Sequence, residues 1–437
     1  MNKSLSIKQL KLFGIYLALI ILVLLPFHAI LTVWLSSLVG HYTLLRLWKE
    51  ILMVIMSVFA VIILIKDKKL LSKLLKSKLM LLMLLYILIH VVVGIWAYES
   101  KKVNLTALGD GLITNLRLIV FFALCLIFSY YNDFLKKNWD KILLIPAALV
   151  IVFGLMQHFI LPLNFLQHLG YNANTIAPYQ TVDQNINYVR IQSTLRGSNP
   201  LGAYLILIIP AALAFFIRAK KGTNIKKVLF IYIIAAITVL FYSYSRSAWA
   251  GAIIASGFVI WLMANKKLRF QMTGLFILLL IAFSVSLVVY RHNTRFEDTF
   301  FHTSSLTHSP VSSDQNHESA LISGLKDIAH NPLGKGPGSA GPASVHNNHP
   351  PLISEDYFLQ IAEEVGVIGL IVFLAIYIYI GKILWQQRRD ALSLVLFASL
   401  LGITLVNLFS HAWTDDTLGL IWWGLAGVAS APVILDR

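Results

Sequence analysis

Long apolar runs separated by short polar segments dominate this sequence. A membrane-spanning helix needs about 20 consecutive apolar residues, and twelve runs approach or exceed that length. They lie near residues 12–36, 44–65, 79–97, 112–130, 142–161 and 200–217 in the first half, and near 228–244, 247–264, 270–290, 356–381, 391–410 and 418–434 in the second. The pattern predicts an all-α integral membrane protein with about twelve transmembrane helices.

Two polar segments are much longer than a connection between helices requires. Both are rich in Asn, Gln, Ser, His and Pro. The chain therefore divides into helices one to five (1–161), a first loop (162–199), helices six to nine (200–290), a large second loop (291–355) and helices ten to twelve (356–437). In the second loop, the spacing of Leu321, Leu325 and Ile328 predicts a short helix lying at the membrane surface.

The positions of the basic residues predict the orientation of the helices. Of the 36 Lys and Arg residues, 24 fall in segments on the same side as the N-terminus. Because cytoplasmic loops are enriched in Lys and Arg, both termini are expected in the cytoplasm and both long loops outside it. The net charge of +16 would suggest nucleic acid in a soluble protein, but here it reflects orientation, and no nucleic-acid partner is expected.

Composition supports a membrane protein. Hydrophobic residues make up 58% of the chain and charged residues 13%, which is too apolar for a soluble fold. The first apolar run follows a basic start but lacks a small-residue cleavage site, so it predicts a retained helix and not a signal peptide. The single cysteine, Cys125, lies in an apolar stretch, which leaves no internal disulfide or cysteine metal site.

Two arginines lie near the end of the first long loop. Arg190 and Arg196 precede Asn199-Pro200, where the sixth helix begins. An Arg guanidinium can bind phosphate oxygens through two hydrogen bonds, and a helix N-terminus also favours an anion. The pair therefore predicts an anion site at the outer membrane boundary. The alternative is that both side chains are interface anchors and Asn199-Pro200 only caps the helix.

A third arginine, Arg246, lies in the very short outer turn between the seventh and eighth helices. A charge so close to the bilayer is costly without a partner. That partner is expected to be a bound anion, or a carboxylate in another loop.

The second long loop ends in a glycine cluster, two histidines and two carboxylates. The glycines, from Gly334 to Gly338, follow no strand and so predict a shaped turn and not a nucleotide loop. His346 and His349 have no clear third ligand, and no metal site is predicted. Glu355 and Asp356 begin the tenth helix, where one of them is expected to cap it.

Further ionisable residues lie in or near the predicted helices, where they are candidates for function or for structural pairing. They are Arg46, Glu50, Arg117, His411, Asp415 and Asp416.

Four motifs over roughly 190–425 resemble the O-antigen ligase and polymerase superfamily in their order and common extracytoplasmic side. They are Arg190-x-x-Ser-Thr running into Asn199-Pro-Leu-Gly, Ser245-Arg-Ser-Ala-Trp, Asn331-Pro-Leu-Gly-x-Gly-Pro-Gly, and Tyr357-Phe-Leu-Gln-Ile-Ala-Glu-Glu-Val-Gly-Val-Ile-Gly. The first half of the chain agrees only in its pattern of spans.

The resemblance implies a multi-pass enzyme of the bacterial inner membrane, with its active site facing the periplasm or exterior. Such an enzyme transfers a glycan from a polyprenyl (undecaprenyl) diphosphate donor to a hydroxyl of a glycan or lipid-linked acceptor, in surface polysaccharide or lipopolysaccharide synthesis. No cofactor or metal is implied. Arg190 and Arg246 match arginines expected to hold the diphosphate, whereas Arg196 has no firm counterpart and rests on its position.

The chain departs from the ligase pattern at one place. Ligases of this family typically carry a histidine eleven residues before the glycine matched by Gly366, but Glu355 occupies that position here and Asp356 follows it. A carboxylate can serve as general base on the acceptor hydroxyl. The substitution therefore favours a polymerase over a ligase. His346 or His349 could replace the missing histidine if the loop folds back, with His349 as the fallback base, which keeps the ligase interpretation open.

Two other functions compete with glycosyl transfer. A flippase or exporter of lipid-linked glycans without catalysis would need basic residues along a cavity at mid-membrane depth, whereas these arginines gather at one face. A peptidoglycan polymerase of the shape, elongation and division type uses the same lipid carrier, but its motifs are absent from the sequence.

Overall fold

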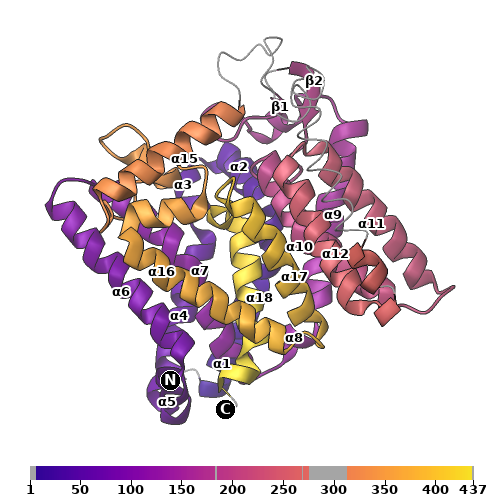
Figure 1. The fold of residues 1–437 in the computed structure, drawn as a ribbon, viewed down its shortest axis with the longest axis horizontal. Helices are drawn as coiled ribbons and strands as arrows, with labels where there is room; N and C mark the ends of the chain where they lie inside the picture. Colours follow the sequence, from indigo (N-terminus) through magenta and orange to yellow (C-terminus); the bar gives the residue numbers. More distant parts are fainter. Residues whose placement is uncertain (1–5, 183–184, 268, 275–312, 436–437) are drawn as a thin grey trace.

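The computed structural model describes residues 6–182, 185–267, 269–274 and 313–435, and most of this part is helical (Figure 1). Ten of the described segments are long and apolar enough to span a membrane. They are Ile7–Val39, α4 (Trp48–Lys66), α6 (Lys78–Glu99), α7 (Leu105–Ser129), α9 (Trp139–Phe159), α10 (Ser198–Arg218), α11 (Asn224–Tyr242), α12 (Arg246–Met263), α16 (Tyr357–Gln386) and α18 (Asp416–Leu435).

The all-α membrane architecture expected from the hydropathy pattern is confirmed. Ten of the twelve predicted spans correspond to these segments. An eleventh, predicted at 391–410, is α17 (Ala391–Asn407), which is apolar but only 17 residues long. The twelfth, predicted at 270–290, lies almost wholly outside the described residues.

Short helices fill the ends and connections. The first span consists of α1 (Ile7–Leu24), a 3-10 turn η1 (Leu25–Phe27) and α2 (His28–Val39), because Pro26 interrupts the helical hydrogen bonds. The helix expected around Leu321 to Ile328 is present as α15 (Ser313–His330). The others are α3 (Tyr42–Arg46), α5 (Lys68–Lys76), α8 (Phe134–Lys137), η2 (Phe165–Leu169), η3 (Gly341–His346) and η4 (Ala412–Thr414).

The first long loop contains a β-hairpin that the sequence pattern did not predict. Strand β1 (Gln180–Val182) pairs antiparallel with β2 (Asn185–Arg190), and Gln180 lies opposite Arg190. The strands are short and mostly polar, so they carry no apolar alternation that would reveal them in the sequence. The pairing places Arg190 at the base of the hairpin, and its side chain bonds to Asn199 at the start of α10.

Helix α18 forms the centre of the bundle. It packs chiefly against α7, and all but a few of its side chains are buried. Helix α10 is also largely buried, between α11, α12 and α17. By contrast, α4, α6 and α11 keep many large apolar side chains exposed, as expected for a surface that faces lipid.

The two ends of the bundle differ. The start of α1, the end of α18 and α5 lie at one end, whereas β1, β2 and α15, which belong to the two long loops, lie at the opposite end (Figure 1). The two loops therefore share one side of the molecule, which we refer to as the outer end.

A break in α16 anchors the second long loop. Val365 and Gly366 leave helical geometry, with a φ of +74° at Gly366. The loop supplies hydrogen bonds at this break: the N–H of Lys335 donates to the carbonyl of Glu363 at 2.8 Å, and the N–H of Gly336 to that of Glu364 at 2.8 Å. The N–H of Val367 in turn donates to the Pro332 carbonyl at 3.0 Å.

The glycines of this loop are required by close backbone contacts. A Cβ at Gly334 would lie 2.5 Å from the Glu364 carbonyl oxygen, and one at Gly366 would lie 2.6 Å from the Pro332 carbonyl oxygen. The glycine cluster is thus the shaped turn that the sequence predicts, and the N–H groups of Lys335 and Gly336 bond to helix carbonyls.

We predict that Gly366→Ala destabilises the protein. Its backbone conformation is essentially confined to glycine, which by itself costs about 1–3 kcal/mol for another residue, and the new Cβ would also strike the Pro332–Leu333 backbone. Thermal unfolding in detergent should show a lower midpoint. Gly257→Ala in α12 is the matched control, because a Cβ there meets nothing within 4 Å. Equal midpoints for the two variants would contradict this account of the break.

A second prediction concerns sidedness. In a Cys125→Ser background, a cysteine at the exposed Asn187 of β2 should react with a membrane-impermeant maleimide in intact cells. A cysteine at the exposed Lys227, at the start of α11, should react only after lysis. The reverse pattern would invert the topology that the basic residues predict.

Candidate functional site

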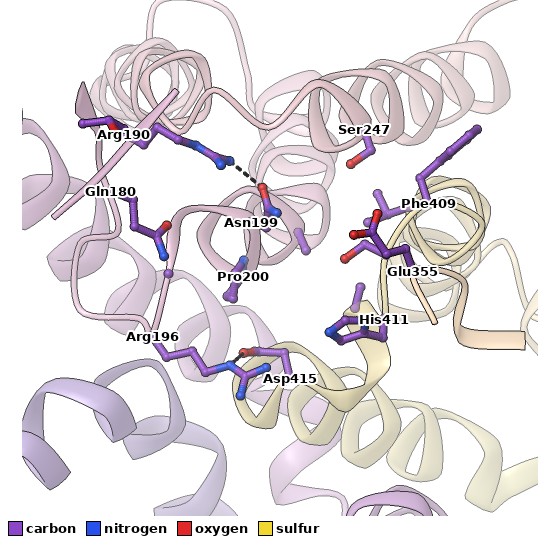
Figure 2. Close-up of a pocket in the computed structure, with 16 residues that line it drawn as sticks. Gln180, Arg190, Arg196, Asn199, Pro200, Ser247, Glu355, Phe409, His411 and Asp415 are labelled. Carbon is purple, nitrogen blue, oxygen red and sulfur yellow. Dashed lines mark hydrogen bonds and ion pairs between the residues drawn. The ribbon is translucent and has the colours of Figure 1, made fainter. Parts of the chain in front are cut away.

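A polar cavity of about 650 Å³ opens at the outer end of the bundle. Four parts of the chain far apart in sequence line it: the first long loop with the start of α10, the start of α12, Glu355 just before the N-cap of α16, and the turn between α17 and α18. Its polar lining includes Gln180, Arg190, Arg196, Asn199, Ser247, Glu355, His411 and Asp415 (Figure 2). The site therefore exists only in the folded chain.

Arg190 is held in place by acceptors on two helices. Its Nε donates to the carbonyl of Ser243, at the end of α11, at 2.9 Å. Its Nη2 donates to the side chain of Asn199 in the first turn of α10. Figure 2 shows the guanidinium directed into the space near Asn199. The sequence prediction that Arg190 lies near the start of the sixth helix is consistent with this geometry.

Arg196 reaches the cavity from a segment that is itself firmly anchored. Ser193 donates its hydroxyl to the Val150 carbonyl at 2.6 Å, and Thr194 donates to the Pro26 carbonyl at 2.7 Å. The Gln157 side chain accepts from the backbone N–H of Ser193 at 2.8 Å. Because these buried polar contacts replace water, the Arg-x-x-Ser-Thr motif holds the chain against α9 and η1 while Arg196 projects outward.

Arg196 pairs with a carboxylate at the start of α18. Its Nε lies 3.5 Å from Oδ2 of Asp415; the Arg196 side chain is 47% exposed and that of Asp415 is 6% exposed. Oδ1 of Asp415 accepts from the N–H groups of Thr417 at 3.0 Å and Leu418 at 3.1 Å, which caps α18. Burial raises the pKa of Asp415, and the charge of Arg196 opposes that rise. The pairing favours the ionised carboxylate.

The structure separates the roles of Glu355 and Asp356. Asp356 is the N-cap of α16, since its side chain accepts from the N–H of Leu359 at 2.8 Å. Burial raises its pKa, and hydrogen bonds from Leu359 and Phe358 oppose that rise. Glu355, one residue outside the cap, lines the cavity. Figure 2 shows its carboxylate across the cavity from Arg190 and beside His411.

His411 lies on the same wall as Glu355 (Figure 2). Burial lowers its pKa to about 4, helped by the charge of Arg196 and opposed by a hydrogen bond with the backbone of Ser354. The ring is therefore neutral at physiological pH. Its Nδ1 is buried and has no hydrogen-bond partner in the described part of the chain. The sequence marked His411 only as an ionisable residue in the last outer turn.

The remaining candidates lie elsewhere. Arg246 is exposed at the first position of α12, beside Ser247, which lines the cavity. His349 is exposed and does not line this cavity. Nε2 of His346 lies 3.4 Å from Oδ2 of Asp110 on α7.

The sequence did not reveal Gln180 as a site residue, because no local pattern marks it. Its side-chain oxygen accepts from the N–H and the hydroxyl of Ser198, and this contact ties β1 to α10.

A second cavity, of about 590 Å³, shares the wall formed by Gln180, Arg196 and Asp415. The N-terminal helices supply most of its other side, including Tyr42, Arg46, Lys49, Asp110 and Arg117. The lining mixes both charges with Asn174, Thr114 and Thr175. It is therefore a polar space on the far side of the Arg196–Asp415 pair.

Buried ion pairs form the floor of this second cavity. Asp416 accepts from Arg117, and lies 3.3 Å from the Lys49 ammonium and 3.0 Å from Nε2 of His28. Glu50 lies 3.1 Å from Lys49 and 3.5 Å from Arg117. The sequence left Glu50, Arg117 and Asp416 open between function and structural pairing. In the structure they pair across α4, α7 and α18, and His28 and Lys49 are further partners.

Comparison with known proteins bears on the second half of the chain. Residues 231–374 match a family model described as O-antigen ligase. The match covers about a third of the chain and includes Arg246, His349, Glu355 and Asp356, whereas Arg190 and Arg196 precede it. No curated protein matches the chain. This multi-span membrane protein, with ten apolar helices among its described residues, is therefore similar to the O-antigen ligase family over residues 231–374.

Proposed function

We propose that the protein transfers a glycan from a polyprenyl diphosphate to an acceptor hydroxyl at the extracytoplasmic face of the bacterial inner membrane. The observation that carries the proposal is the meeting of Arg190, Arg196 and Glu355 around one cavity at the outer end. Cations suit a diphosphate, and a carboxylate across from them suits proton removal from an acceptor.

The reaction is a direct displacement at the anomeric carbon of the donor. The acceptor oxygen forms the new glycosidic bond while the bond from the anomeric carbon to the diphosphate oxygen breaks. The electron pair of that bond leaves with the polyprenyl diphosphate, and the hydroxyl proton passes to a carboxylate. Negative charge grows on the leaving group, so fixed arginines lower the barrier without protonating it.

Glu355 is the residue to which we assign the base. A carboxylate at a helix N-terminus is a poor base, because the helix stabilises its charged form. Here Asp356 occupies the cap and accepts from the helix N–H, whereas Glu355 lies outside the helix and lines the cavity. His411 on the same wall is the competing base, and the exposed His349 is a weaker candidate.

Two cavities on either side of the Arg196–Asp415 pair suit an enzyme with two substrates. The first, with Arg190 and Glu355, would hold the donor diphosphate, and Arg246 is the neighbour of Ser247 in its lining. The second has carboxylates, amides and hydroxyls that suit sugar hydroxyls, and we assign it to the acceptor glycan. We favour a polymerase over a ligase, because Glu355 stands where ligases of the family carry histidine.

We predict that Arg190→Lys and Arg246→Lys each reduce glycan transfer roughly 100-fold, the order of loss found when one charge-stabilising donor is removed. The measurement is surface-polysaccharide chain length on gels, in cells lacking the native gene. Arg218→Lys, at the other end of α10, is the control and should be active. Because Arg190 also bonds to Ser243 and Asn199, membrane abundance and thermal unfolding of each variant must be compared. Normal transfer in both variants would leave these arginines as interface anchors.

Glu355→Gln should abolish transfer while the protein still folds, since it keeps size and hydrogen bonding but removes the proton acceptor; a general base contributes roughly 100- to 10,000-fold. Asp356→Asn should retain activity and lower thermal stability slightly, because an amide still caps α16. His411→Ala and His349→Ala test the two competing bases in the same assay. Normal transfer by Glu355→Gln combined with an inactive His411→Ala would assign the base to the imidazole instead.

A further inference from the structure

A third cavity, of about 590 Å³, lies at the end of the molecule where α18 ends, opposite the two long loops. It is formed by α5, the start of α6 and the last turns of α16 and α18. Figure 1 shows α5 at that end, far from the hairpin and α15. Five lysines line the cavity: Lys69, Lys73, Lys76, Lys78 and Lys382. Among the lining residues that the structure describes, none is acidic.

The fold holds these lysines around one space. α5 is amphipathic: Leu70 and Leu74 are buried, while Lys69 and Lys76 remain exposed. The neighbouring acid, Asp67, caps α5 by accepting from the N–H of Leu70 at 3.0 Å and also accepts from the Tyr131 hydroxyl at 2.7 Å. Lys73 donates to the Leu435 carbonyl at the end of α18. Both carboxylate oxygens of Asp67 thus accept hydrogen bonds, one from the first turn of α5 and the other from Tyr131.

Orientation in the membrane requires positive charge on this side, but it does not require an enclosed space. Five ammonium groups around one cavity repel each other, and a bound anion would remove that repulsion. Ser72, Ser77 and Tyr379 add hydroxyl donors to the lining, and Ile383, Val433 and Ile434 add an apolar wall. Cations and hydroxyls beside an apolar wall match a lipid phosphate and the chain attached to it.

We propose that this cavity binds the phosphate of an anionic phospholipid, with its acyl chains leaving along Ile383, Val433 and Ile434. The site is separate from the proposed transfer site at the outer end and does not depend on it. A zwitterionic lipid carries its own cation beside the phosphate and would not offset the lysine charges. Bound lipid would join α5 to the ends of α16 and α18.

The test is thermal unfolding of the full-length protein in detergent, with phosphatidylglycerol, with phosphatidylcholine of the same acyl chains, or with inorganic phosphate. Phosphatidylglycerol should raise the midpoint more than either of the others. The variant Lys69→Gln/Lys76→Gln/Lys382→Gln should lose at least half of that shift. The control Lys220→Gln/Lys221→Gln/Lys227→Gln removes the same charge from another loop at this end and should keep the shift.

Each of the following outcomes would overturn the proposal. An equal loss in the control variant would mean general attraction of anionic lipid to a basic surface. An equal shift with inorganic phosphate would mean a free-anion site, and an equal shift with phosphatidylcholine would mean no charge selectivity. If the triple variant does not fold, Lys382→Gln alone is compared with Lys220→Gln, and native mass spectrometry counts the phosphatidylglycerol molecules that each retains. Equal counts would also reject the site.

Discussion

Two adjacent carboxylates at the start of α18 hold the outer end of the protein together. Asp416 binds Arg117, Lys49 and His28, which fixes α7, α4 and α2 to the central helix. Asp415 caps α18 and pairs with Arg196, which fixes the first long loop. A buried charge is tolerated only when it is paired and hydrogen-bonded. The position of both outer cavities therefore depends on these pairs.

Buried backbone groups must be hydrogen-bonded as well, and the break in α16 shows how this is achieved. Non-helical backbone at membrane depth is tolerated only where protein groups satisfy it. The loop from Pro332 to Gly336 does so by bonding to Glu363, Glu364 and Val367, on either side of the break. Glu364 extends the contact by accepting from the Gly338 N–H at 2.7 Å and from Asn115 on α7. The first turns of α16, which Glu355 precedes, are thus fixed to both the loop and the bundle.

Arg190 and Arg196 are held in place before any substrate binds, which suits the proposed chemistry. Arginines stabilise charge on a leaving group most when they are already in place, because no reorganisation is then needed. Arg190 is bonded to α10 and α11, and Arg196 projects from a segment anchored to α9 and η1. The Arg196–Asp415 pair also forms part of the wall between two polar cavities, so a donor and an acceptor could meet beside it.

The sequence by itself determined the helical spans, the separation of two long loops and the candidate arginines, because hydropathy and charge act locally along the chain. It also predicted that one of Glu355 and Asp356 caps a helix and that the glycine cluster is a turn. Only the tertiary structure decided that Asp356 is the cap and that Gln180 and His411 line the cavity. It also decided that Asp415 pairs with Arg196 whereas Asp416 pairs with Arg117. Those choices depend on which side chain lies across a helix interface, and no local pattern encodes it. The hairpin β1–β2 was missed for the same reason, since its strands are defined by pairing and not by apolar alternation.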